Sequence, residues 1–567
     1  MIVVVAPPAR ARGSGGGREA LVAVAQLRLM ILSILFGAGV LAILGKLAFL
    51  ALSAGPATQR DLTNALVPAR GDIVDRNGTP LARSIDAWTI AIHPNQVIGD
   101  KAALAQKLAE LIPERSQGQY YALLNSGGGF AFLKRRALPE LVNAMNALGE
   151  PAIEFQRETD RLYPQSDMAA HVLGYLDAKG NGVTGMEKVL EARLIDPAQR
   201  GKPVMLSLDA RVQAALESEL GRAMVDLQAR GAAAVVLDVH TGEVVAMTSL
   251  PSFNPNALGG PPPRNNVTQS VYELGSTFKP IAIAAAIDSG TITSMARRFD
   301  ATAPMKVGRF TIHDDPGDEQ FRWLNIPETL IYSSNIATAR IADELGADKM
   351  QAMFRRLGFD QRPSIEIGAT RPLWPANWGR ITVMTTAYGH GIAVTPLHLA
   401  AAYAALVNGG IWRPATLMKV DAAHPAAGRR VLQEATSARM RQLLRLIVLK
   451  GTGRKGEAPG YRVAGKTGTA EAASEGGYDK HRNVSTFAAA FPIDAPRYVV
   501  VAMLDSPKAN ANTPRTTAAW TVAPVVSRLI ARTGAILGIA PDNARDIDES
   551  DLLPLVDRSP EPKATAE

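Results

Sequence analysis

The longest apolar stretch of the chain lies near its N-terminus. Leu29–Gly45 contains no charged residue, and after Lys46 the apolar pattern continues to about Leu52. As a helix, Leu29–Leu52 would reach about 36 Å at 1.5 Å per residue, which is enough to cross a hydrocarbon core of roughly 30 Å. The pattern therefore predicts a transmembrane helix over residues 29–52.

The charges before this helix predict its orientation. Four arginines precede it and one acidic residue opposes them: Arg10, Arg12, Arg18, Arg28 and Glu19. Because an excess of positive charge stays on the inner side, we expect residues 1–28 to form a cytoplasmic tail. A single-pass protein of the cytoplasmic (inner) membrane would then expose the rest of the chain to the periplasm. The alternative is a cleaved signal peptide, although secretory apolar cores usually run only about 7–15 residues.

Beyond the helix, residues 57–230 mix two periodicities. Trp88–Ile92 alternates like a strand, whereas Lys101–Leu111 has the spacing of an amphipathic helix. This predicts an irregular α+β module. At about Gly231 the pattern changes to a strand pair, Ala232–Leu237 and Glu243–Met247, around a Gly-containing turn.

Residues 231–540 begin and end with predicted strands. The middle has helical spacing, in 280–287 and in several amphipathic stretches between 326 and 408. Two strands follow, 485–491 and 498–503, and then a helix over about 517–533. Strands that enclose a helical middle predict an α+β domain, with an antiparallel sheet and helices segregated around it. Residues 541–567, rich in Asp, Glu and Pro, should be a flexible tail.

The amino-acid composition excludes several kinds of functional site. The chain of 567 residues has a net charge of +8 without a basic run, which argues against nucleic-acid binding. It has no cysteine, so thiol nucleophiles, disulfides and cysteine-ligated metals are excluded. Its eight histidines form no ligand-spaced cluster. We therefore expect no metal site.

The first chemical signal is Ser276-Thr-Phe-Lys279, followed by an apolar run. On a helix, residues three apart share a face, so the hydroxyl and the amine can meet. A hydroxyl needs a base to become a nucleophile, and a lysine desolvated by apolar neighbours can act as one. Alone the pattern is weak, because Ser and Lys at this spacing also occur on exposed helices.

Two further motifs strengthen the signal. Ser333-Ser334-Asn335 lies 57 residues downstream, at the start of a predicted helix, where a helix cap is the structural explanation. Lys466-Thr467-Gly468-Thr469 lies just before the terminal strand pair, where a bent surface strand is the alternative. In this order, Ser-x-x-Lys, Ser-x-Asn and Lys-Thr-Gly form the signature of penicillin-recognising serine enzymes.

With these motifs the chain resembles the class B penicillin-binding proteins, over nearly everything after the membrane helix. Four further stretches carry the resemblance: Arg70–Ala82, Arg161–Pro164, Gly182–Glu187 and Ala246–Asn256. The resemblance implies a pedestal (dimerisation-type) domain over 57–230 and a transpeptidase domain over 231–540. It also implies a D,D-transpeptidase that cross-links peptidoglycan stem peptides, needs no cofactor and is inhibited covalently by β-lactams.

The resemblance also implies roles for the motif residues. Ser276 would attack the carbonyl between the last two D-alanines of a stem peptide and release D-Ala, with Lys279 as the base. Ser333 would relay a proton to the leaving amine, tuned by Lys466. The backbone N–H groups of Ser276 and Thr469 would form the oxyanion hole. The remaining motif residues would hold the donor peptide: Asn335, Thr467, Gly468 and Thr469.

Arg264–Pro280 and Thr386–Pro396 resemble the division-specific branch of the family, the FtsI (penicillin-binding protein 3) type. That branch implies a septal glycosyltransferase partner of the shape, elongation, division and sporulation (SEDS) class, FtsW type, and other divisome proteins. Small residues four apart, Ala38 and Ala42, would let a partner helix approach the membrane helix. The alternatives are the elongation-specific branch and a helix that faces only lipid.

Other interpretations remain open at this level. A β-lactam sensor or scaffold would keep the motifs without turnover, and a β-lactamase would be a single small soluble domain. Gly460–Thr467 matches the Walker A pattern, but its polar, Gly-rich context lacks the strand and helix of a phosphate loop. The charged residues of the first pedestal motif could form a buried network or bind a partner: Arg70, Asp72, Asp75 and Arg76.

Overall fold

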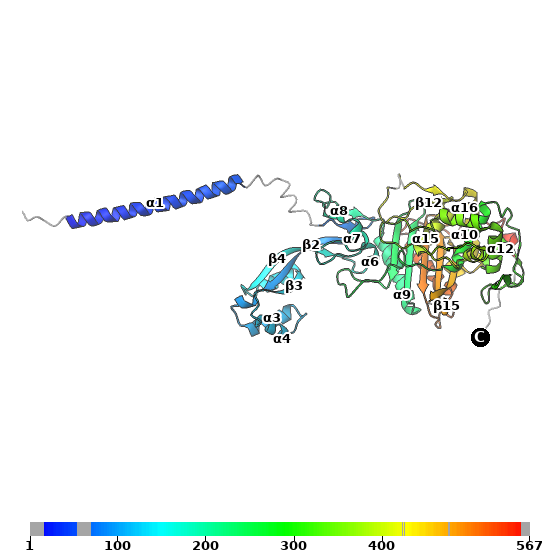
Figure 1. Ribbon diagram of the computed structural model, residues 1–567, viewed down its shortest axis with the longest axis horizontal. Coiled ribbons are helices and arrows are strands. Elements are labelled where there is room, and N and C mark those ends of the chain that lie inside the picture. The colour runs from blue at the N-terminus through cyan, green and yellow to red at the C-terminus, as the bar shows by residue number, and fades with distance from the viewer. Residues whose placement is uncertain (1–15, 54–69, 422, 424–425, 475–476, 557–567) are drawn as a thin grey trace, which may run out of the picture. The chain divides into compact units, whose positions relative to one another are not determined.

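The computed structural model describes residues 16–53, 70–421, 423, 426–474 and 477–556, and its contacts divide the chain after Val67. The N-terminal unit contains α1, a single helix over Gly16–Ser53 (Figure 1). Within it, Gln26–Phe49 is long and apolar enough to cross a membrane, with a mean hydropathy of 2.4. The predicted spanning helix is present. It begins before residue 29, so the expected tail is helical from Gly16, and residues 1–15 lie outside the described residues.

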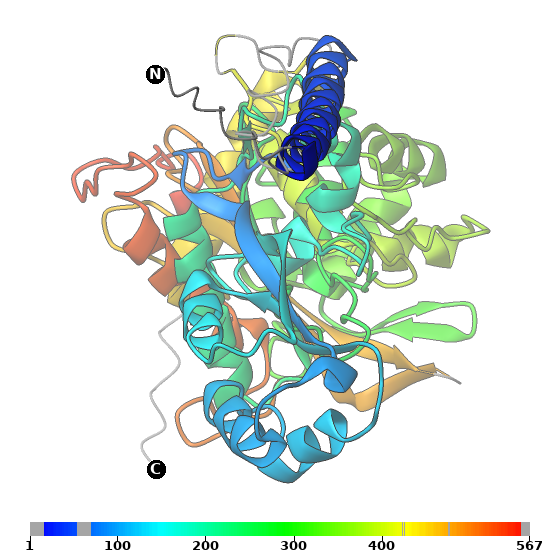
Figure 2. The ribbon, with the colours of Figure 1, turned by 90° about the vertical axis from the view of Figure 1, so that its left-hand side faces the viewer.

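The second unit opens with a sheet of order β3-β2-β1-β5, in which β4 also pairs with β2. Its strands are β1 (Ile73–Val74), β2 (Pro80–Ile92), β3 (Ala131–Ala137), β4 (Ile153–Leu162) and β5 (Val204–Met205). Three helices accompany it: α3 (Lys101–Leu111), α4 (Gln117–Leu124) and α5 (Pro139–Asn146). Ile90 and Ile92 at the end of β2 pack with Leu108 and Tyr120, so the helices cover that end of the sheet (Figure 2). The predicted α+β character of this region is confirmed.

The four charged residues of the first pedestal motif, Arg70, Asp72, Asp75 and Arg76, bond to partners outside this set of four. Arg70 and Arg161 each donate to the fully buried Glu187, both at 2.7 Å. Arg76 instead pairs with Glu243 at 2.7 Å. The two aspartates accept hydrogen bonds from backbone N–H groups. Asp75 accepts those of its own turn, and Asp72 accepts that of Ser84. The expected buried network is therefore present only in part: Arg70 shares the buried Glu187 with Arg161, whereas the other three charged residues have separate partners.

A second, fully antiparallel sheet has the order β14-β15-β16-β6-β7. Its strands are β6 (Gly231–Asp238), β7 (Val244–Leu250), β14 (Ala464–Ser474), β15 (Gly477–Phe491) and β16 (Tyr498–Asp505). The four predicted strands are present, and the sheet brings the first pair against the last. Strand β14 carries the Lys-Thr-Gly motif, for which a bent surface strand was the structural alternative, but Lys466 and Thr467 in it are buried.

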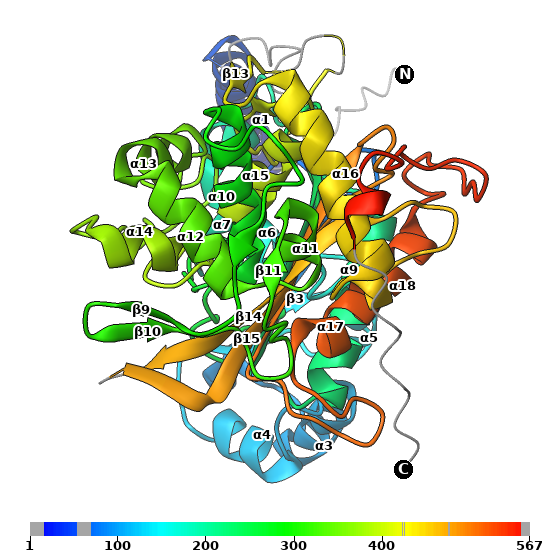
Figure 3. The same cartoon turned by 90° about the vertical axis from the view of Figure 1, so that its right-hand side faces the viewer.

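Helices cover both faces of this sheet (Figure 3). Val235 of β6 points toward α10 (Lys279–Asp288) and α15 (Pro396–Val407), whereas Val236 points toward α9 (Ala210–Asp226) and α18 (Ala523–Thr533). Because both faces are covered, every residue of β6 is buried. Three more helices pack with the first group: α11 (Ile326–Ile331), α12 (Asn335–Leu345) and α16 (Glu434–Lys450). The expected helices segregated around an antiparallel sheet are confirmed.

The remaining elements are short. They are α6 (Ala170–Leu173), α7 (Gly185–Val189), α8 (Glu191–Ile195), α13 (Ala347–Arg356), α14 (Arg380–Thr386), β8 (Phe299–Asp300), β9 (Met305–Val307), β10 (Phe310–Ile312), β11 (Trp323–Leu324), β12 (Ile411–Trp412), β13 (Arg429–Arg430) and the 3-10 turns η1 (Pro94–Gln96), η2 (Gly275–Phe278), η3 (Arg454–Gly456) and η4 (Leu553–Leu555).

The C-terminal region differs from expectation in two places. The helix expected over 517–533 is divided into α17 (Ala518–Thr521) and α18, because Pro524 in the first turn of α18 cannot continue a preceding helix. Residues 541–556 are not a flexible tail. Asp546 pairs with Arg445 at 2.6 Å and Leu552 is fully buried, so this segment packs onto the domain. Residues 557–567 lie outside the described residues.

Candidate active site

The three motifs meet around one hydroxyl. Lys279 Nζ donates to Ser333 Oγ at 3.0 Å and also to the Ser333 carbonyl oxygen. Lys466 Nζ, from β14, donates to the same Ser333 Oγ at 2.9 Å. Ser276 lies in η2, one turn before Lys279. The serine is thus in a 3-10 turn rather than in the helix itself, and such a turn also puts residues three apart on one side.

Both lysine side chains are fully buried, and burial disfavours their charged forms. Burial lowers the pKa of Lys279 to about 8, although Asp315, Asp314 and Asp318 oppose the shift. Burial also lowers the pKa of Lys466, and the charge of Lys279 lowers it further. Two amines that share one hydroxyl cannot both be charged cheaply without water. The neutral form of Lys279, the form that can act as a base, therefore becomes available as the pH approaches about 8.

The Ser-x-Asn segment is held by its own helix cap. Ser334 is the N-cap of α12, and its Oγ accepts the N–H of Ala337 at 3.1 Å. Ser333, just before the cap, has a left-handed backbone with φ of 57°. Such strain in a non-glycine residue persists only where surrounding contacts enforce it. Here it directs both the carbonyl and the hydroxyl of Ser333 toward Lys279.

Glycines let two backbone segments approach η2, the turn that carries the predicted nucleophile Ser276 and is called the nucleophile turn below. A Cβ on Gly468 would lie 2.4 Å from the carbonyl oxygen of Leu274, so β14 packs directly on η2. A Cβ on Gly389 would lie 2.2 Å from the carbonyl oxygen of Gly275. Gly275 and Gly389 also have positive φ, 55° and 83°. Only glycine fits such contacts, and they fix Ser276 against the Lys-Thr-Gly strand.

The other motif residues have partners that the sequence does not reveal. Thr467 Oγ1 donates to Thr452 Oγ1 at 2.7 Å. Thr469 Oγ1 accepts the backbone N–H of Ala518 at 3.1 Å, which leaves its own proton free to bind a ligand oxygen. Asn335, buried at the start of α12, bonds to the segment that follows β10. These partners lie at least 15 residues from the motif residues in the sequence, so no local sequence pattern predicts the contacts.

The Walker A interpretation is wrong. A phosphate loop must follow a strand and open a helix. Here Gly465, Lys466 and Thr467 are themselves strand residues, and Lys466 pairs with Ala488 of β15. The lysine is fully buried between the two other motifs and is not part of a phosphate-binding loop. Among the residues that the structure describes, no group of three or more His, Asp or Glu side chains could hold a metal.

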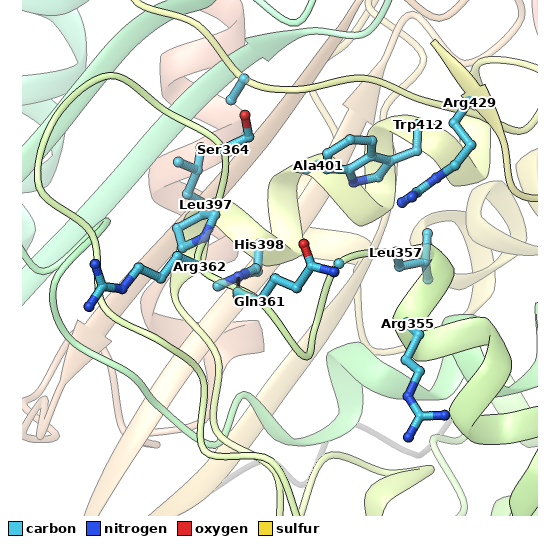
Figure 4. Close-up of a pocket in the computed structure, with 13 residues that line it drawn as sticks. Arg355, Leu357, Gln361, Arg362, Ser364, Leu397, His398, Ala401, Trp412 and Arg429 are labelled. Carbon is cyan, nitrogen blue, oxygen red and sulfur yellow. Dashed lines mark hydrogen bonds between the residues drawn. The ribbon is translucent and has the colours of Figure 1, made fainter.

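A separate cavity of about 240 Å³ lies between α13, α15 and β12 (Figure 4). It contains none of the motif residues. His398 lines it, with Nδ1 bound to Thr395 and Nε2 donating to the Gln361 carbonyl at 2.9 Å. Burial lowers the pKa of His398 to about 4, so it remains neutral and serves as a cap of α15. This cavity therefore lacks a catalytic set of its own.

Family models match most of the chain. Residues 232–527 match the penicillin-binding protein transpeptidase domain. Residues 65–204 match the penicillin-binding protein dimerisation domain. The two matches occur in the same order as the two predicted domains.

Individual proteins give the same result. The chain is 39% identical over 493 residues to a protein named probable peptidoglycan D,D-transpeptidase FtsI from Caulobacter vibrioides, with 83% of this chain and 82% of that protein covered. It is 30% identical over 481 residues to the peptidoglycan D,D-transpeptidase FtsI of Escherichia coli, covering 78% and 80%. The transpeptidase domain of Burkholderia pseudomallei penicillin-binding protein 3 superposes with a TM-score of 0.54 at 30% identity, covering 59% of this chain and 97% of that one. The chain therefore belongs to the class B penicillin-binding proteins, in which a dimerisation domain precedes a transpeptidase domain.

Proposed function

We propose that the chain is a peptidoglycan D,D-transpeptidase of septal wall synthesis that works through an acyl-enzyme on Ser276. The observation that carries the proposal is the convergence of two buried lysines, Lys279 and Lys466, on Ser333 beside the Ser276 turn. Relatives named as peptidoglycan D,D-transpeptidases support the substrate class.

In the first half-reaction, Ser276 Oγ attacks the carbonyl carbon between the last two D-alanines of a donor stem peptide. The hydroxyl proton passes to the neutral amine of Lys279, and the backbone N–H groups of Ser276 and Thr469 stabilise the oxyanion. As the C–N bond breaks, the leaving amine takes a proton from Ser333, which Lys466 replenishes. D-Ala departs and the acyl group stays on Ser276.

In the second half-reaction, an amine of a neighbouring stem peptide attacks the acyl-enzyme. The amine loses a proton to the same basic groups, the new amide forms and Ser276 regains its hydrogen. Thr467, Gly468 and Thr469 bind the terminal carboxylate of the donor, and Asn335 holds its amide. A β-lactam acylates Ser276 in the same way, but its leaving group remains attached after the ring opens.

The apolar helix α1 anchors the chain in a membrane. The arginines before the span favour a cytoplasmic N-terminus and a catalytic unit in the periplasm. Close small residues on the helix support a helical membrane partner of the SEDS class, FtsW type, among divisome proteins. The rival functions are elongation-specific transpeptidation and a β-lactam sensor without turnover.

Labelling with a fluorescent penicillin tests the nucleophile. The wild-type protein should be labelled covalently, Ser276→Ala should not, and Ser289→Ala, at the far end of α10, should label normally. Because Ser276 is buried, thermal unfolding of each variant checks that the fold survives the loss of one hydroxyl group. Undiminished labelling of Ser276→Ala would overturn the assignment. Penicillin labelling of Ser276 without D-Ala release from a stem peptide would favour the sensor.

A further inference from the structure

The cavity between α13, α15 and β12 has a positively charged lining (Figure 4). Three arginines border it, Arg355, Arg362 and Arg429, and its lining contains no aspartate or glutamate. His398, which also lines it, adds no charge, because burial lowers its pKa to about 4. The rest of the wall is largely apolar and is formed by Leu357, Leu397, Ala401, Trp412 and Ala415. The cavity thus combines positive charge with an apolar wall.

The charge of the three arginines is only partly balanced. Arg355 lies 3.9 Å from a carboxylate oxygen of Asp360. Arg429 donates to a neutral acceptor, the carbonyl oxygen of Arg356, at 2.6 Å. Arg362 makes neither a hydrogen bond nor an ion pair with any residue that the structure describes. Because neighbouring positive charges add to one potential, the cavity should attract anions.

Two N–H donors at the cavity also lack an acceptor. The indole nitrogen of Trp412 is buried and has no hydrogen-bond partner in the described part of the chain. Gln361 accepts His398 Nε2 through its backbone carbonyl, but within the same described residues its side-chain amide is unbonded. In Figure 4 the Arg429 guanidinium lies beside the Trp412 ring, across the cavity from Gln361. A ligand oxygen would satisfy a buried N–H group whose desolvation is otherwise uncompensated.

We propose that this cavity is a binding site for a small oxyanion, a carboxylate or a phosphate ester, on an apolar body. Arg429 and the indole N–H of Trp412 bind the anionic oxygens, and the apolar wall covers the body of the ligand. The guanidinium of Arg429 lies 4.9 Å from the Trp412 ring centre, so the two donors are held together. A guanidinium has five N–H groups, which leaves donors for a bidentate contact. The volume of about 240 Å³ suits a ligand no larger than a bicyclic aromatic acid.

The proposed site is separate from the peptide site, because none of the motif residues lines it. It nevertheless adjoins the packing behind the nucleophile turn. The ring of Phe359 lies 6.3 Å from that of His398 and 5.2 Å from that of Phe278, which stands between Ser276 and Lys279. The inference does not depend on the proposed function, and binding can be measured on protein whose serine is already acylated.

Isothermal titration calorimetry of the full-length protein tests the proposal, with detergent buffer as the blank. The probes are 2-naphthoate, 2-naphthyl phosphate, inorganic phosphate and the uncharged 2-naphthylmethanol. At least one naphthyl anion should bind with a Kd below about 1 mM, as a small ligand with an apolar body can. The tighter of the two identifies the preferred anionic group. Inorganic phosphate and 2-naphthylmethanol, which each lack one half of the ligand, should bind at least tenfold more weakly.

Variants locate the binding. Arg429→Gln should weaken binding about tenfold, because it removes a charge-assisted contact. Arg430→Gln is the matched control and should bind like the wild type, since Arg430 is the next residue, lies outside the lining and donates to the carbonyl oxygens of Gly409 and Leu432. Trp412→Phe keeps a ring but removes the N–H and should weaken binding severalfold. Thermal unfolding of each variant monitors the fold.

Prior acylation with benzylpenicillin separates this cavity from the peptide site. Binding of the naphthyl anion should be retained in the acylated protein. Loss of binding on acylation would place the ligand at the peptide site and overturn the inference. Equal losses in Arg429→Gln and Arg430→Gln would also overturn it, because net charge alone would then explain the binding, as would a wild-type Kd above about 1 mM for both naphthyl anions. A failure of benzylpenicillin to acylate the wild type would contradict the proposed function and leave the calorimetric test intact.

Discussion

Ser333 is the residue on which the chemistry depends most. Its oxygen accepts hydrogen bonds from both Lys279 and Lys466. A serine hydroxyl has two lone pairs and one proton, so these two bonds occupy its acceptor capacity. Its own proton is then directed elsewhere, which suits a group that must donate to the leaving amine. The two-lysine arrangement thus suits the proton-donor role that we propose for Ser333.

The acylation rate should follow the protonation of Lys279. Burial lowers the pKa of this amine to about 8, against the carboxylates of Asp315, Asp314 and Asp318. The neutral form acts as the base, so acylation by benzylpenicillin should rise about tenfold per pH unit from pH 6 and level off above about pH 8. Asp318→Asn removes a carboxylate that raises this pKa, so its rising limb should move to lower pH. A rate that is flat from pH 6 to 9 in stopped-flow measurements would exclude Lys279 as the base.

At the scale of elements, the Lys-Thr-Gly strand lies at the edge of its sheet. β14 ends the order β14-β15-β16-β6-β7, so only one side of it is paired in the sheet. An edge strand presents unpaired N–H and C=O groups, which can bind an extended peptide as an added strand. Gly468 brings this edge against the nucleophile turn. The scissile bond of a stem peptide on β14 would therefore lie next to Ser276.

Replacing Gly389 tests whether this backbone packing matters. In Gly389→Ala the new Cβ would lie 2.2 Å from the carbonyl oxygen of Gly275, so the nucleophile turn must shift. Acylation should fall at least tenfold, because small misplacements of reacting groups are costly. Gly308→Ala is the matched control, since Gly308 also has positive φ but has open space around its Cβ position. The two variants should share a modest loss of thermal stability from backbone strain. Equal acylation rates would show that the contact is dispensable.

The sequence predicts elements whose signals are local. The apolar run after Lys279 and the Ser334 cap mark α10 and α12, and both are present. For β14 the sequence offers only a surface strand as an alternative, because the burial of Ala464–Thr467 removes the apolar and polar alternation that marks a half-buried strand. The contacts of Asp315 with Asn335, 20 residues apart, need the folded chain to be seen. Likewise, the acidic composition of residues 541–556 does not predict the ion pair between Asp546 and Arg445.

At the scale of the whole molecule, an anchor helix is followed by a unit that contains both sheets. A septal function predicts the phenotype of cells that lose the protein. Depletion should give elongated cells unable to septate, visible by phase-contrast microscopy, and wild-type protein should restore division. The Ser276→Ala variant, expressed at equal abundance, should not restore division. Cells that round up while still dividing would instead indicate the elongation-specific branch.

The central claim is that a stem peptide is transferred through Ser276. The most direct measurement is mass spectrometry of the purified protein after incubation with a pentapeptide that ends in D-Ala-D-Ala, quenched with acid and digested. We predict one acyl adduct, lacking the terminal D-Ala, on the peptide that contains Ser276, together with released D-Ala. Addition of an amine-bearing acceptor should remove the adduct and yield the cross-linked product. An adduct on another residue, or D-Ala release undiminished in Ser276→Ala, would contradict the account.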